Sequence, residues 1–285
     1  MPDLGGIPSL LRRGRGRLLP APSQHGQPRN VTGGRRHQLG SDTSDLPGSE
    51  RAASPPPLNT DLAAIQQTIP LNPRNGRHSM KRHISIILDR SGSMSSVQSA
   101  TEEGLRGFIA EQRNTPGDTT VSLYQFDNEY DIVYEHQPLS DIPEFHLHPR
   151  GSTALLDAVG KTIHRMREHF TQLPEVAQPD EVIVVILTDG QENDSWTYTP
   201  GRIMRRITHQ QDEHGWRFVF LGADQEAFSA AAAIGIGRES TLSYSGDRTQ
   251  ETLTRAGVMV SRGTRTGSFS FTQDDRDTTT TRESR

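Results

Sequence analysis

The chain has 285 residues, a formal net charge of −4 and a sequence pI near 6.3, so its charge does not indicate nucleic acid or an anionic membrane as a partner. It has no cysteine, which excludes disulfides, cysteine zinc sites, iron–sulfur clusters and a thiol nucleophile. No apolar stretch approaches the roughly 20 residues that span a bilayer. Residues 1–20 hold no continuous apolar segment typical of a secretory signal, so we expect a cytoplasmic protein.

Residues 1–79 differ in composition from the rest of the chain. They hold most of the 18 prolines, many glycines, serines and arginines, and few aromatic residues. Such a segment buries too little apolar surface to offset the entropy lost on ordering, so we expect 1–79 to be disordered. Two alternatives stay open. The segment is a basic tail that contacts an acidic partner, or the natural protein starts at Met80, directly before the first predicted strand.

From residue 80 to about 262, predicted strands alternate with predicted helices. The apolar, β-branched run HISIILD at 83–89 predicts a buried strand. The turn at 127–129 separates two strand-like runs and predicts a hairpin. EVIVVILTDG at 181–190 is typical of a central parallel strand buried on both faces. In chain order, the predicted strands are 83–89, 119–126, 130–135, 181–190, 216–224 and 240–244, and the predicted helices are 97–113, 153–170, 201–215, 225–235 and 247–262.

This alternation of elements predicts the fold class. Strands separated by helices of about 10–15 residues favour a mostly parallel sheet with helices on both faces. We therefore expect 80–262 to form a Rossmann-like, doubly wound α/β domain. Its sheet should have six strands, mostly parallel, with one antiparallel edge strand. Residues 263–285 are polar and are predicted to form a disordered tail.

Side chains that carry oxygen follow the predicted strands. Asp89, Ser91 and Ser93 come directly after the first strand, Thr153 lies in the loop that opens a helix, and Asp189 ends the central strand. Because ligands of open α/β sheets bind outside the carboxyl ends of the strands, we expect these side chains to lie together. Such oxygen ligands suit Mg²⁺, Mn²⁺ or Ca²⁺ and not a soft metal.

These five residues resemble a known motif. The von Willebrand factor A-type (vWA) domain, also called the integrin I domain, carries a metal-ion-dependent adhesion site (MIDAS) spelled D-x-S-x-S, then a threonine, then an aspartate. Asp89, Ser91 and Ser93 match its first part, Thr153 its second and Asp189 its third. The resemblance implies that Ser91, Ser93 and Thr153 coordinate the metal directly. It implies that Asp89 and Asp189 act mainly through bound waters or by holding the ligands.

The same resemblance implies a binding module and not an enzyme. A Glu or Asp of a partner protein would complete the metal coordination. The bacterial, intracellular type of vWA protein is often an adaptor beside an AAA+ ATPase or in a signalling system. Two other functions stay open: a metal-dependent hydrolase that uses the same site, and a scaffold without metal. For DRSGSM at 89–94 taken alone, an ordinary turn with a helix cap is the alternative interpretation.

Other polar residues lie close to these loops in the sequence. His146 and His148 are expected to belong to a polar loop, with metal or partner contact as the alternative. Asp224 ends a strand at the same sheet edge, where we expect it to cap the next helix, with a place in the rim that a partner contacts as the alternative. The residues expected to form a rim that a partner contacts are Arg90, Met94, Glu192, Asn193 and Asp194.

Overall fold

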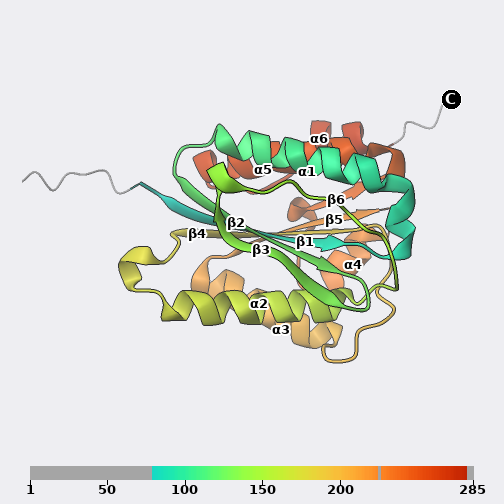
Figure 1. The fold of residues 1–285 in the computed structure, drawn as a ribbon, viewed down its shortest axis with the longest axis horizontal. Coiled ribbons are helices and arrows are strands. Elements are labelled where there is room, and N and C mark those ends of the chain that lie inside the picture. Colours follow the sequence, from blue (N-terminus) through green and yellow to red (C-terminus); the bar gives the residue numbers. More distant parts are fainter. Residues whose placement is uncertain (1–78, 224–225, 281–285) are drawn as a thin grey trace, which may run out of the picture. The chain divides into compact units, whose positions relative to one another are not determined.

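The computed structural model describes residues 79–223 and 226–280 (Figure 1). Apart from Ser79, the segment predicted to be disordered, 1–79, lies outside the described residues, as does Asp224. The described residues form a six-stranded sheet in the order β3-β2-β1-β4-β5-β6. Every neighbouring pair of strands is parallel except β2 and β3. The prediction of a Rossmann-like α/β fold with one antiparallel edge strand is therefore confirmed.

The strands are β1 (Lys81–Asp89), β2 (Asp118–Phe126), β3 (Tyr130–Pro138), β4 (Glu181–Thr188), β5 (Arg217–Ala223) and β6 (Thr241–Tyr244). The α-helices are α1 (Gln98–Arg113), α2 (Leu155–Gln172), α3 (Pro200–His214), α4 (Ala227–Ala233), α5 (Thr249–Thr266) and α6 (Gln273–Thr279). The chain leaves β1 outward to β2 and β3 and then returns to β4 on the other side of β1. Strand order therefore reverses between β1 and β4, which is where ligands bind in open α/β sheets.

The sheet separates two apolar cores. In β4, Ile183, Val185 and Leu187 belong to the core on one face, and Val184 and Ile186 to the core on the other. Successive side chains of a strand point to opposite faces, so a strand covered on both sides must be apolar throughout. Helices α1 and α5 cover the first face, and α2 and α3 cover the second (Figure 1). Among the described residues, no helix is both long and apolar enough to cross a membrane.

The disordered tail predicted from residue 263 is wrong as far as residue 280. Helix α5 continues to Thr266, and Phe269 and Phe271 then pack into the core beneath it. Helix α6 begins with a capping box in which Thr272 and Asp275 exchange hydrogen bonds. Two phenylalanines in a polar stretch leave little hydrophobic pattern in the sequence. Their burial depends on a groove that exists only in the folded domain.

The first strand also buries a histidine. His83 is fully buried, and its Nδ1 lies 2.9 Å from the Thr120 hydroxyl. Its Nε2 has no hydrogen-bond partner among the described residues. The centre of the His136 ring lies 4.9 Å from the centre of the His83 ring and 3.7 Å from that of His169, on which it stacks. The backbone of His136 has a φ of 51°. Burial, and then the charges of His136 and His169, lower the pKa of His83 to about 3.

His83 should make stability fall in mild acid. Its folded pKa lies below the unfolded value of about 6.5, so its contribution is complete above pH ~6.5 and declines as the pH falls toward 3. His83→Gln should reduce the loss of unfolding free energy between pH ~6.5 and ~4.5, by up to about 1.4 kcal/mol per pH unit. Urea unfolding at several pH values measures this.

The control for this pH series is the exposed His148, whose substitution by Gln should leave the slope unchanged. Burial raises the pKa of Asp89 to about 6, so Asp89 affects the unfolding free energy in the opposite direction over part of the same pH range. It is present in all three proteins, so the comparison between them isolates His83. Equal slopes for the wild type and His83→Gln would contradict the assignment.

Candidate functional site

The carboxylate of Asp89 lies at the point where β1 ends, and it is fully buried. One of its oxygens accepts a hydrogen bond from the backbone N–H of Ser91 at 2.6 Å. The other accepts from the hydroxyl of Thr188, the last residue of β4, also at 2.6 Å. Burial raises the pKa of Asp89 to about 6 against the effect of these hydrogen bonds, and the charge of Asp189 adds to the rise. Asp89 thus joins the ends of the two central strands.

Three hydroxyl groups lie together beside this carboxylate. The Ser91 and Ser93 hydroxyl oxygens are 3.0 Å apart, and Ser93 donates a hydrogen bond of 2.7 Å to Asp189. A Cβ atom added to Gly190 would lie 3.1 Å from Thr153 Oγ1, 3.7 Å from Ser93 Oγ and 3.8 Å from Ser91 Oγ. All three oxygens therefore surround one small space that the glycine leaves open. We call Ser91, Ser93 and Thr153 the hydroxyl cluster.

The donor set of this site fits a hard divalent cation. The cluster provides three neutral oxygens, and Asp89 and Asp189 provide negative charge beside them. Mg²⁺, Mn²⁺ and Ca²⁺ prefer oxygen ligands of this kind. In the part of the chain that the structure describes, no three His, Cys, Asp or Glu side chains are grouped to hold a metal. A cation here would therefore depend on serine and threonine oxygens. The five residues predicted from the sequence do lie together.

The loop after β4 holds Thr153 in place. The Thr153 carbonyl accepts hydrogen bonds from the backbone N–H groups of Asn193 at 3.0 Å and Asp194 at 3.2 Å. The Thr153 N–H donates to the side chain of Asn193 at 2.9 Å. Asp194 accepts from the Ser152 hydroxyl at 2.6 Å, and Glu192 accepts from the N–H of Leu156 at 2.9 Å. The position of the cluster's third hydroxyl thus depends on a loop about 40 residues further along the chain.

A second buried carboxylate fastens the far end of that loop. Asp157, in the first turn of α2, accepts hydrogen bonds from the N–H groups of Thr197 and Tyr198 at 2.9 Å and of Trp196 at 3.4 Å. Burial acts to raise the pKa of Asp157, but the hydrogen bonds from Tyr198, Thr197 and Trp196 outweigh it and hold the pKa below its usual range. Nothing in the sequence distinguishes Asp157, because an acidic residue in the first turn of a helix is common.

The predicted rim is partly wrong. Arg90 is only 6% exposed and makes ion pairs with Asp127 at 3.1 Å and Asp131 at 2.6 Å, while Met94 is a core residue. Asp127 also accepts from Arg150 at 2.8 Å and from the N–H of Glu129. This network fixes the hairpin turn to the loop that precedes Thr153. Glu192, Asn193 and Asp194 are used in the loop contacts described above.

Trp196 is the prominent exposed residue near the site that sequence analysis missed. Its side chain is 90% exposed, on the loop between β4 and α3. No periodic pattern marks a single aromatic residue in a polar loop, so the sequence carries no signal for it. His146 and His148 are both exposed, as expected for a polar loop, and His146 lies near the carboxylates of Glu102 and Glu144.

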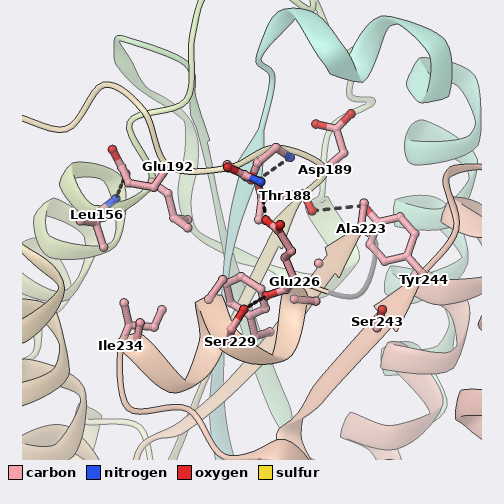
Figure 2. Close-up of a pocket in the computed structure, with 18 of the residues that line it drawn as sticks. Leu156, Thr188, Asp189, Glu192, Ala223, Glu226, Ser229, Ile234, Ser243 and Tyr244 are labelled. Carbon is pink, nitrogen blue, oxygen red and sulfur yellow. Dashed lines mark hydrogen bonds between the residues drawn. The ribbon is translucent and has the colours of Figure 1, made fainter.

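A cavity of about 860 Å³ opens beside Asp189 and Gly190 (Figure 2). The ends of β4, β5 and β6 and the helix α4 form its wall. Its lining includes apolar side chains such as Leu156 and Ile234 and the acidic residues Glu192 and Glu226. Its volume is within the range typical of ligand-binding pockets. A group bound at the hydroxyl cluster would have this cavity next to it.

Comparisons with known proteins find similarity in structure alone. No family model matches the chain, and no curated protein matches it. Proximal thread matrix protein 1 from the mussel byssus matches 65% of this chain at 15% identity, with a TM-score of 0.46. The ArnB paralogue VWA2 from Sulfolobus acidocaldarius matches 62% at 17% identity, with a TM-score of 0.44. A von Willebrand factor type A structure from Catenulispora acidiphila matches 62% at 14% identity, with a TM-score of 0.41.

These similarities cover only part of each protein. The chain spans 46% of the mussel and Sulfolobus chains and 42% of the Catenulispora chain. Another structure of the mussel protein has zinc in its MIDAS motif. With TM-scores below 0.5, none of these likenesses assigns a family. The fold described here depends on the strand order and pairing within this chain.

Asp157→Ala should loosen the loop between β4 and α3. Removing the carboxylate leaves three backbone N–H groups without their acceptor, which should cost about 1–3 kcal/mol of unfolding free energy. Amide hydrogen exchange at 196–198 should become faster than in the wild type. The exposed Asp212 has no such contacts, so Asp212→Ala is the control. Unchanged exchange at these amides would contradict the role given to Asp157.

Proposed function

We propose that this chain is a divalent-metal-dependent protein-binding module of the vWA type. One observation carries the proposal: the Ser91, Ser93 and Thr153 hydroxyls surround one space at the strand-order reversal, with two carboxylates beside it. Mg²⁺ is the ion proposed, with Mn²⁺ or Ca²⁺ as the other hard cations of suitable chemistry. Binding, and not catalysis, is the proposed activity.

The chain's own residues would hold the ion and leave part of its coordination open. The hydroxyl cluster would provide the direct ligands, and Asp89 and Asp189 would orient them and balance charge. When bound, the cation supplies an electrophilic centre that attracts a carboxylate. Three neutral ligands and two carboxylates do not readily fill six positions, which favours an acidic side chain from a partner protein as the remaining ligand.

The surroundings of the cluster support a partner of this kind. The cavity beside Asp189 and Gly190 offers apolar contacts to residues that flank the partner's Glu or Asp. The exposed Trp196 provides an aromatic contact of the type enriched at interfaces. We place the protein among bacterial intracellular adaptors that act with an AAA+ ATPase or a signalling component, as the sequence resemblance implies. The hydrolase alternative would need a general base beside the ion, and among the described residues no histidine lines this cavity.

Thr153→Ala should weaken metal binding. It removes one ligand of the hydroxyl cluster and should weaken Mg²⁺ or Mn²⁺ binding by at least about tenfold, the effect of losing one charge-assisted contact. Calorimetric titration of each ion into the full chain measures it. Ser96→Ala is the control, because Ser96 is an exposed hydroxyl outside the cluster, in the turn that carries Ser91 and Ser93. Equal affinities for both variants would contradict the assignment of Thr153.

Gly190→Ala should abolish metal binding while the fold persists. The added methyl group would occupy the space between the hydroxyls, 3.1 Å from Thr153 Oγ1. Gly190 does not have a positive φ, so we expect the unfolding free energy to change by about 1 kcal/mol or less. Gly92→Ala is the matched control, because its new Cβ would meet only Gly151 O, at an ordinary 3.6 Å. Full metal affinity in Gly190→Ala would overturn the proposed position of the ion.

A further inference from the structure

A second concave site lies between α2 and α3, away from the hydroxyl cluster. This cavity has a volume of about 350 Å³. Four arginines line it, and we call the site the arginine cleft. Arg167 comes from α2, and Arg202, Arg205 and Arg206 come from the first half of α3. Its other lining residues are Ile163, His209 and Gln210, so no carboxylate lines it.

The arginines of this cleft lack counter-charges. Within residues 79–223 and 226–280, no Asp or Glu forms an ion pair with any of the four. Elsewhere the domain pairs its arginines readily: Arg90, Arg165 and Arg255 all contact carboxylates. The whole chain carries a net charge of −4, so four unpaired guanidinium groups in one cavity are a local concentration of positive charge.

Neighbouring residues hold two of these arginines in place. The Tyr198 ring lies against Gly160 of α2, where an added Cβ would come within 2.6 Å of it. Arg202 and Arg206 lie over this ring at 5.3 Å and 5.2 Å from its centre. Arg202 also donates a hydrogen bond of 2.9 Å to the Thr197 carbonyl. Cation–π contacts of this kind restrict the arginine side chains before a ligand binds. Less conformational entropy is then lost on binding.

A buried polar group lines the same cavity. Gln210 is only 1% exposed, and its Oε1 has no hydrogen-bond partner among the described residues. An unpaired buried amide oxygen is unfavourable unless a water or a ligand group donates to it. Phosphate oxygens are acceptors and cannot donate to this amide oxygen, so the positive charge of the cleft comes from its arginines and a water would have to satisfy Gln210.

We propose that the arginine cleft binds a small molecule that carries two or more phosphate groups. Guanidinium groups match phosphate oxygens in paired hydrogen bonds, and four of them can contact more than one phosphate. The volume of the cavity lies within the range of small-molecule sites. Arg202 and Arg206 lie over the Tyr198 ring, so this ring is not a free platform on which a base of single-stranded nucleic acid could stack.

Calorimetric titration of the full chain with inorganic tripolyphosphate tests this proposal. EDTA is present throughout, so that the result does not depend on the proposed metal site. Inorganic phosphate, sulfate and a mixed-sequence RNA oligomer are titrated at the same ionic strength. We expect one tripolyphosphate per chain, bound at least about tenfold more tightly than phosphate or sulfate, because each added phosphate reaches further guanidinium groups.

The variant Arg167→Gln/Arg205→Gln should weaken tripolyphosphate binding by at least about tenfold. Neither side chain makes a hydrogen bond, ion pair or ring contact with another described residue, so the melting temperature should not change. The control Arg106→Gln/Arg113→Gln removes the same charge from exposed positions on α1 and should bind within about twofold of the wild type. The single variants Arg167→Gln and Arg205→Gln serve if the double variant unfolds.

Three results would overturn the proposal. One is equal weakening in both double variants, which would indicate a general charge effect. Another is tighter binding of RNA than of tripolyphosphate, which would indicate a nucleic-acid surface. The third is the absence of saturable tripolyphosphate binding by the wild type.

Discussion

The buried hydrogen bond between Thr188 and Asp89 joins the carboxyl ends of the two central strands, and the rest of the site depends on it. Asp89 can occupy this position only because a hydroxyl and a backbone N–H satisfy both of its oxygens. These contacts direct the chain into the turn that places Ser91 and Ser93. Asp189 follows β4, the strand paired directly with β1, and so lies beside Ser93. Burying a carboxylate costs free energy. A buried Asp89 is therefore expected where fixing the position of the loop is worth more than the stability that its burial costs.

The third hydroxyl is positioned in a different way. Thr153 lies before α2, and the loop after β4 holds it through backbone contacts with Asn193 and Asp194. Asp157 fastens the other end of this loop through three backbone N–H groups. Two carboxylates of opposite behaviour thus serve one site: burial raises the pKa of Asp89, whereas hydrogen bonds keep that of Asp157 low.

The two proposed sites use separate parts of the molecule. The hydroxyl cluster lies at the carboxyl end of the sheet, and the arginine cleft lies between two helices that cover one face. Tyr198 links them, because its N–H donates to Asp157 and its ring carries Arg202 and Arg206. A ligand in the arginine cleft would contact Arg202 and Arg206, the two side chains that lie over the Tyr198 ring.

The fold, and the grouping of Asp89, Ser91, Ser93, Thr153 and Asp189 at one edge of the sheet, could be predicted from the sequence because their signals are local. A strand buried on both faces must be apolar along its length, and small oxygen-bearing residues directly after such strands must lie at the carboxyl edge of the sheet. The ordered C-terminal segment could not be predicted, since Phe269 and Phe271 are buried only by a groove that α5 helps to form. Arg90 was expected at the rim for the same reason: nothing local shows that Asp127 and Asp131 neutralise it.

The sequence by itself therefore determined the α/β class, the strand that precedes each loop and the kinds of ligand atom that meet at the site. Only the tertiary structure decided which polar residues are free to bind. It assigned Glu192, Asn193 and Asp194 to the loop that holds Thr153, and it placed no carboxylate of the described residues against the four arginines of the cleft. The physical reason is that pairing between charged side chains depends on contacts between residues far apart in the chain, which spacing and composition do not record.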